Sequence, residues 1–436
     1  MRTQTLHVAI KLMKHQQHST DVLVIGGGPA GLAAASCAAQ GGARVSIVDD
    51  NPHLGGQIWR GEHENTSHPE AAEWLRRVRD AKVNFITGAR VYDQPEAGRL
   101  LAETFAGVVE LGYRKLILAT GARERFLPFP GWTLPGVAGA GGLQALVKCG
   151  LPIAGKKIVV AGTGPLLLAV AAYLRKCGAN VLLIAEQTPQ RRLLSFGVSL
   201  WRSPSKILQA LQLKRALLGI AHLTNCWTVA AHGEEQLQRV TLRRGQKTWD
   251  VHCDYLACGF HLVPNVELAN FFSCKLRDGV VQVDELQETT IPGIYCAGES
   301  TGIGGLELSL VEGQIAGFAA TDQLEKARTL FPERRKQQQF AELLNRAFAL
   351  REELKRLPQP DTIVCRCEDV SFAQLKEYAA WRAAKLQTRC GMGPCQGRIC
   401  GAAIEFLLGW QPESVRPPVY PVNVGNLIHS ASNGNH

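Results

Sequence analysis

The 436-residue sequence lacks the marks of a secreted or membrane-spanning protein. Its first twenty residues are polar and contain neither a long apolar run nor a small-residue cleavage site. Residues 1–19 are therefore expected to form a flexible leader. The longest apolar stretch, from Ile158, is interrupted by Gly-Thr-Gly-Pro, which indicates a strand, a turn and a helix. We expect no transmembrane segment and a location in the cytoplasm or peripherally on the inner face of a membrane.

Paired cysteines are also scarce in the first three quarters of the chain. No C-x-x-C motif occurs between Asp21 and Ala320, and Cys37, Cys149 and Cys177 stand alone in apolar segments. Thiol–disulfide chemistry is therefore disfavoured there, and single buried cysteines suit a reducing compartment. The net charge of +10 comes from scattered runs that are typical of solvated helix faces. No nucleic-acid site is expected, whereas acidic partners and anionic cofactors are compatible with this charge.

A dinucleotide-binding pattern begins at Asp21. Gly26, Gly28 and Gly31 follow an apolar strand in G-x-G-x-x-G spacing, and Asp49 ends the next apolar strand 18 residues beyond Gly31. The first glycine makes the turn, the second lets the backbone approach a pyrophosphate, and the third lets helix and strand pack closely. The helix N-terminus attracts the phosphates, and the acid can accept hydrogen bonds from a ribose.

A second copy of the pattern begins at Lys156. Gly162 and Gly164 hold the first two glycine positions, Leu167 replaces the third, and Glu186 ends the following strand. Leucine at the close-packing position should push the helix away or reshape the turn. The sequence leaves three readings open: an NAD(P) site, an adenine-nucleotide site without hydride chemistry, and a purely structural domain.

Five cysteines lie close together near the end of the chain. Cys365 and Cys367 form a C-x-C pair, and a helical segment separates them from Cys390, Cys395 and Cys400. Four thiolates can hold a [2Fe–2S] cluster, and neighbouring glycines let backbone amides face its sulfurs. Four thiolates also make a structural zinc site. We favour iron–sulfur, because a cluster gives a redox cofactor an outlet for single electrons.

Three further segments follow the first pattern in a meaningful order: "NPHLGGQIWR" from Asn51, "LILATGARER" from Leu116 and "GIYCAGES" from Gly293. This order resembles flavoproteins with two dinucleotide-binding domains and the glutathione-reductase-like fold. The resemblance implies FAD in the first domain, with Glu299 at the position where that family more often has aspartate. The implied FAD-binding residues are Gly26, Gly28, Pro29, Ala30, Gly31, Asp49, Gln57, Thr120, Gly121, Gly298 and Glu299.

The closing segment "TRCGMGPCQGRICG", Thr388 to Gly401, resembles the [2Fe–2S] domain of bacterioferritin-associated ferredoxin in the variant appended to flavoprotein dehydrogenases. That resemblance implies cluster ligands Cys365, Cys367, Cys395 and Cys400, with Cys390 as a non-ligand. "FLPFPGWTLPGVAGAGGLQAL" from Phe126 and "RPPVYPV" from Arg416 extend the similarity almost end to end. The whole chain resembles the FAD-containing α subunits of heteromeric amine and amino-acid dehydrogenases, which include opine oxidase, proline and hydroxyproline dehydrogenases and hydrogen cyanide synthase.

This family resemblance implies oxidation of a C–N bond of a small amine or amino acid at a flavin, giving an imine. It implies two partners, a second flavoprotein subunit that binds the substrate, and a downstream electron acceptor. No catalytic base can be assigned; His261 is a candidate, but a solvent-facing loop histidine is the preferred interpretation. Two other classes stay open, a stand-alone NAD(P)H-dependent FAD reductase and a non-enzymatic redox sensor or scaffold.

The expected fold is α/β, with two Rossmann-like domains of the glutathione-reductase-like flavoprotein fold and a small helical C-terminal [2Fe–2S] domain. The expected divisions are a FAD-binding domain (20–152 and 266–325), an NAD(P)-type domain (153–265), a connecting helix (326–360), the cluster domain (361–412) and a tail (413–436).

Overall fold

The computed structural model describes residues 16–60, 68–202, 204–411 and 415–427. The expected leader lies outside this range up to residue 15. Its last residues differ from the expectation, because Gln16–Ser19 form strand β1, which pairs in parallel with β7. That strand is polar and short, so it has no alternation of apolar residues from which it could be predicted.

The first domain is built on a parallel sheet with the order β21-β8-β2-β3-β4. Its strands are β2 (Val22–Ile25), β3 (Val45–Asp49), β4 (Asn84–Thr87), β8 (Lys115–Leu118) and β21 (Ile294–Cys296). Helices α1 (Pro29–Gln40), α2 (Pro69–Asp80) and α8 (Leu306–Ala319) belong to the same domain. Helices α1 and α8 touch backbone to backbone: a Cβ at Gly313 or Gly317 would come within 2.2 Å of a carbonyl oxygen of α1.

A four-stranded sheet, β1-β7-β6-β5, extends the first domain. It contains β5 (Arg90–Glu96), β6 (Arg99–Thr104) and β7 (Gly107–Gly112). Part of the expected tail packs here, since the Val419 amide donates to the Tyr92 carbonyl at 2.8 Å and Tyr420 joins the core beneath this sheet. Short elements α7 (Glu267–Phe271), β19 (Leu276–Arg277) and β20 (Val280–Val281) complete the domain.

The second domain holds another parallel sheet, β10-β17-β11-β12-β13, and an antiparallel sheet, β14-β15-β16. The parallel strands are β10 (Val137–Gly139), β11 (Lys157–Thr163), β12 (Asn180–Glu186), β13 (Ala221–Thr224) and β17 (Tyr255–Phe260). Its other elements are α3 (Ala140–Lys148), α4 (Pro165–Lys176), α5 (Gln190–Ser199), η1 (Leu200–Arg202), α6 (Pro204–Ala216), β14 (Cys226–His232), β15 (Arg239–Arg244) and β16 (Lys247–His252). Strands β9 (Ala122–Glu124) and β18 (Leu262–Pro264) pair where the chain crosses between the domains.

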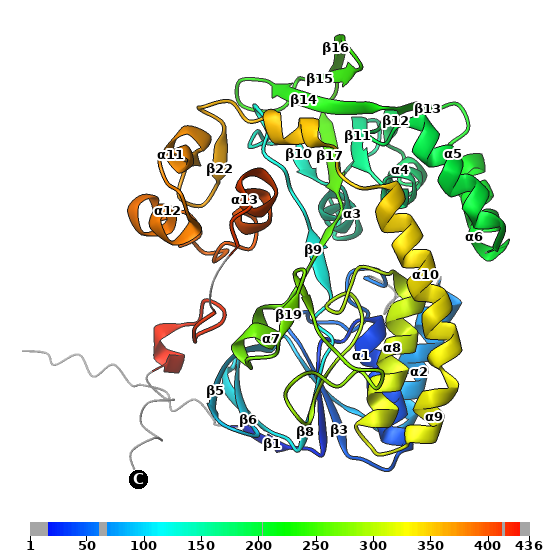
Figure 1. Cartoon of the computed structure of the whole chain (residues 1–436), viewed down its shortest axis with the longest axis vertical. Helices are drawn as coiled ribbons and strands as arrows, with labels where there is room; N and C mark the ends of the chain where they lie inside the picture. The colour runs from blue at the N-terminus through cyan, green and yellow to red at the C-terminus, as the bar shows by residue number, and fades with distance from the viewer. Residues whose placement is uncertain (1–15, 61–67, 203, 412–414, 428–436) are drawn as a thin grey trace, which may run out of the picture.

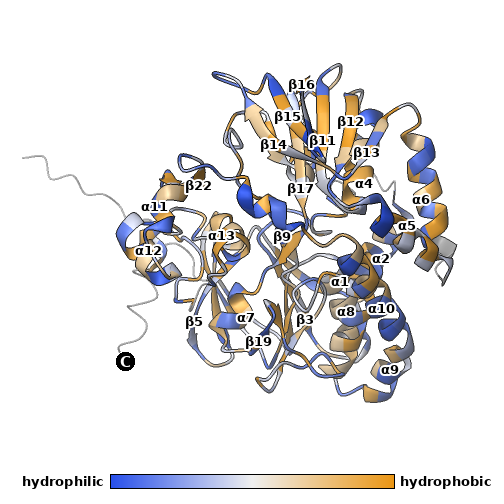
Figure 2. Ribbon diagram, turned by 45° about the horizontal axis from the view of Figure 1, so that its top comes forward, coloured by the Kyte–Doolittle hydropathy of each residue, from blue (hydrophilic) through white to orange (hydrophobic). Residues whose placement is uncertain are grey.

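The expected connecting helix is divided into α9 (Leu324–Thr329), α10 (Phe331–Ala347) and the 3-10 turn η2 (Glu352–Arg356). Helix α10 runs from the first domain to the second (Figure 1). Figure 2 shows α9 and α10 mainly hydrophilic, in contrast to the largely apolar strands β11 and β12.

The cysteine module follows and lies beside the second domain (Figure 1). It contains β22 (Ile363–Cys365), β23 (Val370–Ser371), α11 (Phe372–Lys376), α12 (Trp381–Thr388) and α13 (Cys400–Leu408). Ser371 and Gln374 form a capping box at the start of α11. The Trp132 indole donates to the Ile363 carbonyl at 2.6 Å and so ties β22 to the second domain.

Candidate functional site

The glycine turn of the first domain leaves room for a ligand at one position. A Cβ on Gly26, where φ is +106°, would lie 2.2 Å from the Ala119 carbonyl oxygen, and one on Gly31 would lie 1.8 Å from the Gly26 oxygen. Packing within the protein therefore explains these two glycines. Gly28 is different, because its nearest neighbour would be the Gly56 Cα at 3.8 Å. Helix α1 begins here without a side-chain cap, so its first amides are suited to an anion.

Asp49 is buried at the end of β3 and holds the turn in place. It accepts hydrogen bonds from the Gly27 amide at 2.5 Å, the Asn51 amide at 2.7 Å and the Asn51 side chain at 2.8 Å. Burial raises the pKa of Asp49, and these three donors oppose that rise. Contact between Asp49 and a ribose stays a prediction.

Two other predicted residues belong to the same surroundings. Gln57 accepts a hydrogen bond from the Arg60 guanidinium at 2.9 Å, and Arg60 also donates to Asn51 at 3.3 Å. Gly298, with φ at +80°, lies against α1, because a Cβ there would be 2.8 Å from the Ala30 Cβ. The segments "NPHLGGQIWR" and "GIYCAGES" therefore both reach the glycine turn.

Glu299 offers an unused acceptor at this site. Its Oε1 accepts the Gly305 amide at 3.0 Å at the start of α8. Its Oε2 is buried and has no hydrogen-bond partner within the described ranges. Burial raises the pKa of this carboxyl, and the backbone donors oppose the rise. An orphaned buried oxygen fits a ligand hydroxyl, as the FAD ribityl chain would supply, because such groups are otherwise costly to bury.

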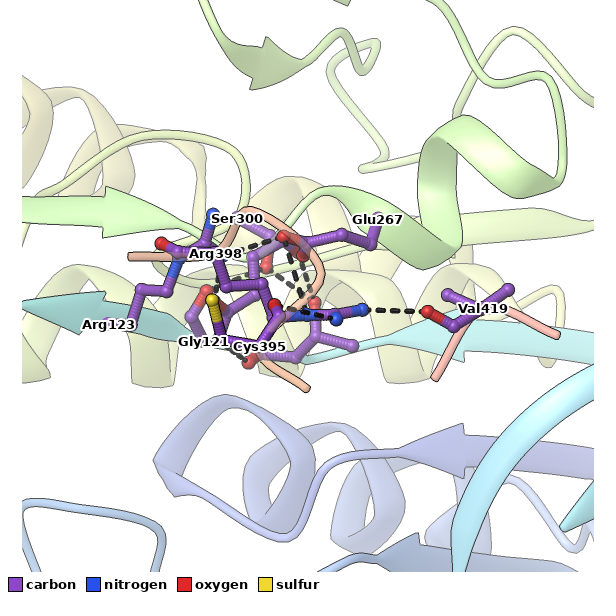
Figure 3. Close-up of polar contacts among 9 residues, drawn as sticks. Gly121, Arg123, Glu267, Ser300, Cys395, Arg398 and Val419 are labelled. Atoms are coloured by element: carbon purple, nitrogen blue, oxygen red, sulfur yellow. Dashed lines mark hydrogen bonds and ion pairs between the residues drawn. The ribbon is translucent and has the colours of Figure 1, made fainter. Parts of the chain in front are cut away.

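A hydrogen-bonded chain joins the predicted residues Thr120 and Gly121 to two residues that the sequence reasoning missed. The Thr120 hydroxyl donates to the Asn265 carbonyl at 2.7 Å and lies 2.9 Å from the Ser300 hydroxyl. Ser300 donates to the Gly121 carbonyl at 3.2 Å, and the Asn265 side chain donates to the Thr120 carbonyl at 2.8 Å. These contacts (Figure 3) fix the turn that follows β8.

Glu312 was also missed. It lies in the middle of α8, is 3% exposed, and accepts the Gly298 amide at 2.9 Å and the Thr301 hydroxyl at 2.8 Å. Burial raises its pKa to about 7. The signal was available, since Glu312 is an acid among the mostly apolar residues of this helical segment.

Three of the five clustered cysteines form a compact buried group. The sulfurs of Cys365, Cys390 and Cys400 all lie within 4.8 Å of one another. The pKa of Cys365 is lowered to about 2, because the thiols of Cys390 and Cys400 donate to it. The same contact with Cys365 raises the pKa of the other two. Cys390, predicted as a non-ligand, is therefore as central to this group as two predicted ligands.

The two remaining cysteines extend the group on one side. The Cys395 thiol contacts those of Cys400 and Cys367, and contact with Cys400 lowers its pKa to about 5. Backbone amides of Gly391 and Gly397 face the sulfurs of Cys365 and Cys395 respectively, as the glycine content suggested. Five sulfur donors with amide support fit a metal or an iron–sulfur cluster. Which four would bind it stays a prediction.

The expectation that no redox-type cysteine pair occurs between Asp21 and Ala320 needs a correction, because Cys253 and Cys258 have the C-x-x-x-x-C spacing. Both are buried, at 4% and 1% exposure, and neither forms a disulfide. Burial raises the pKa of Cys253 to about 12 and that of Cys258 further. Protonated thiols are poor nucleophiles, so this pair does not alter the expectation against disulfide chemistry.

The acid of the second glycine pattern is fully engaged by the protein. Glu186 is buried and accepts the Thr163 hydroxyl at 2.9 Å and the amides of Gly164 and Thr188, each at 2.8 Å. Burial raises its pKa. Leu167 packs toward Gly259, since a Cβ on that glycine would lie 3.0 Å from the leucine side chain. The Leu167 side chain thus occupies the space that Gly259, which has no side chain, leaves on β17.

The segment after α10 lies across the strand ends of the second domain. The Phe348 carbonyl accepts from the Thr163 hydroxyl at 3.2 Å and lies 2.6 Å from His261 Nε2. Gln187 donates to the Ala349 carbonyl at 3.2 Å and accepts the Arg351 amide at 3.1 Å. Strands β11 and β17 meet here, and dinucleotides bind at such a switch point. The chain's own backbone therefore occupies part of that crevice.

His261 corrects one expectation. It does not face solvent: it is half-buried, has φ at +68°, and is held by the Phe348 carbonyl. Burial lowers its pKa, and the Phe348 carbonyl opposes the change. His261 therefore has a structural contact.

The chain matches the family model described as pyridine nucleotide-disulphide oxidoreductase over residues 20–317. An opine oxidase subunit of Agrobacterium tumefaciens (strain Ach5) is 31% identical over 468 residues, covering 94% of this chain and 91% of that protein. Hydrogen cyanide synthase subunit HcnB of Pseudomonas protegens is 29% identical over 423 residues, covering 88% and 90% respectively.

Solved structures show the same fold. L-proline dehydrogenase from P. horikoshii has a TM-score of 0.68 at 20% identity, covering 95% of this chain and 80% of that one. Thioredoxin reductase from T. acidophilum has a TM-score of 0.55 at 18% identity, covering 70% and 98%.

The chain therefore belongs to the pyridine nucleotide-disulphide oxidoreductase family and is an FAD oxidoreductase of that class. Within the class it groups with the opine oxidase subunit, to which it is similar almost end to end. The expected glutathione-reductase-like flavoprotein fold and the resemblance to these dehydrogenase subunits are confirmed. None of the helices described here is both long and apolar enough to cross a bilayer.

Proposed function

We propose that this chain is the electron-handling subunit of a heteromeric dehydrogenase that oxidises a small amine or amino acid. It would carry FAD in the first domain and a [2Fe–2S] cluster in the cysteine module. The relatives include subunits of opine oxidase, hydrogen cyanide synthase and sarcosine oxidase, which supports a multi-subunit enzyme. The buried group of Cys365, Cys390 and Cys400 is the observation that carries the proposal, because a plain flavin reductase has no need of it.

Residues of the first domain would each bind a different part of FAD. The N-terminus of α1 and the space at Gly28 would receive the pyrophosphate, Asp49 would stand beside the adenosine ribose, and Glu299 would accept a ribityl hydroxyl. When bound, FAD supplies the two-electron chemistry of C–N oxidation. A second flavoprotein subunit would bind the substrate, and the cysteine module would pass electrons to a downstream acceptor. We propose the cytoplasm, or the inner face of a membrane, as the site of action.

The metal content of the cysteine module distinguishes an electron relay from a structural zinc site. Iron–sulfur is favoured over zinc because the module is attached to a redox fold. Anaerobic, iron-replete expression followed by metal and sulfide analysis tests the choice. About two irons and two sulfides per chain are expected from the cluster stoichiometry. Stoichiometric zinc without sulfide would exclude the relay.

A stand-alone NAD(P)H-dependent reductase is less well supported. The crevice of the second domain holds residues 348–351, and Glu186 has its hydrogen bonds within the protein. A structural role, or a nucleotide held away from this crevice, agrees better with these contacts than hydride transfer from NAD(P)H does.

A further inference from the structure

Arg398 lies in the loop between Cys395 and Cys400 and ties that loop to the chain around it. Its guanidinium donates to the Val419 carbonyl at 2.8 Å and to the Cys395 carbonyl at 3.3 Å. It also lies 4.1 Å from the centre of the Tyr420 ring. The side chain is 17% exposed, so this arginine serves contacts inside the protein.

Arg123 reaches the same loop from the first domain. It follows Gly121 by two residues on β9, and its Nε donates to the Arg398 carbonyl at 2.9 Å. Its Nη1 donates to the Asn265 side-chain oxygen at 2.7 Å. Since Asn265 bonds to Thr120, an unbroken set of contacts joins the cysteine loop to the turn after β8 (Figure 3).

Glu267 lies between the two arginines. Its Oε1 is 2.8 Å from Arg123 and 3.8 Å from the Nε of Arg398, and its side chain is 15% exposed. Its Oε2 has no hydrogen-bond partner in the part of the chain that the structure describes. One carboxylate thus lies beside two poorly hydrated cations and reduces their mutual repulsion.

We infer that Arg123, Glu267 and Arg398 form an interdomain joint that positions the cysteine loop against the FAD-binding turn. The inference rests on the proposed function, because the turn would hold FAD and the loop would hold the cluster. The three are positioning residues: they act by fixing the spacing between two cofactor sites, and spacing governs electron transfer between them. Three partly buried ionic residues at a domain boundary are costly unless they are paired, which makes the joint specific.

Hydrogen exchange of the full-length chain tests the joint directly. Glu267→Gln and Arg398→Gln should each speed exchange of the amides of residues 395–400 and 120–125 by about tenfold or more, because the domains separate locally. Arg389→Gln is the matched control. Arg389 pairs with Glu368 inside the module at 2.8 Å and is 65% exposed, so exchange should stay at the wild-type rate.

Cofactor content and relay rate complete the test. Both variants should keep FAD, iron and sulfide, while cluster reduction after light-driven flavin reduction slows by about tenfold. If Glu267→Gln does not fold, Arg398→Gln alone tests the joint. Wild-type exchange in both segments of a folded Arg398→Gln protein would overturn the joint. Absence of flavin or iron from the wild type would instead refute the proposed function. The hydrogen-exchange measurement would still show whether the joint exists.

Discussion

Replacing Glu312 by glutamine should change how stability depends on pH. The carboxyl is buried in α8, and burial raises its pKa from 4.5 to about 7. The folded protein then binds this proton more tightly than the unfolded chain does. The stabilisation is complete below pH 4.5 and is lost as the pH rises to about 7. Because one pKa unit is worth about 1.4 kcal/mol, the free energy of unfolding should fall by about 3 kcal/mol over that range.

Equilibrium urea unfolding at about pH 5 and about pH 8, on either side of the raised pKa, measures this effect. Glutamine keeps the shape of a protonated glutamate, so Glu312→Gln should lose the share of the pH dependence that Glu312 contributes. The difference between the two proteins isolates that residue from all other titrating groups. Glu342→Gln, on the exposed face of α10, is the control and should follow the wild type. If the wild type and Glu312→Gln show the same change in unfolding free energy between the two pH values, the raised pKa of the Glu312 carboxyl is refuted.

Three further predictions concern the cofactor sites. Gly28→Val should purify with little FAD, because its side chain would enter the space left for the pyrophosphate; full yellow colour would contradict this. NADH and NADPH should not bleach the flavin rapidly under anaerobic conditions, since residues 348–351 lie across the second crevice, and bleaching within seconds would show that crevice to be open. Cys395→Ser should lose most of the iron and keep FAD, whereas Cys390→Ser should keep both. Iron loss in Cys390→Ser instead would replace the predicted ligand set by one built on the buried group.

The glycine turns could be predicted because their causes are local. Gly31 is required by the Gly26 carbonyl of the same turn, and Gly26 is favoured by its own φ of +106°, so spacing alone reveals them. The capping box of α11 is local in the same sense. The cysteine module was found from the C-x-C pair for the same reason.

Contacts between distant segments could not be predicted in this way. The Phe348 carbonyl meets Thr163, 185 residues earlier in the chain, and Arg398 meets Arg123 across 275 residues. Nothing in the spacing of either segment encodes such a meeting. The expectation that His261 faces solvent was wrong for that reason. A loop position in the sequence says little about which distant segment packs over it.

Which cysteines are buried together could also not be predicted from their spacing in the sequence. A resemblance assigned Cys390 outside the ligand set, whereas the fold buries its sulfur beside those of Cys365 and Cys400. Gly391, with φ at +79°, packs against the indole of Trp381 next to Cys390, and Trp381 shares the buried core of the module with Cys390.

The central claim is that one chain carries both a flavin and an iron–sulfur centre. Anaerobically purified, full-length protein should contain one FAD with about two irons and two sulfides per chain, and reduction should produce the paramagnetic signal of a [2Fe–2S] cluster. Protein that binds FAD but holds zinc, or no metal, in the cysteine module would contradict the account.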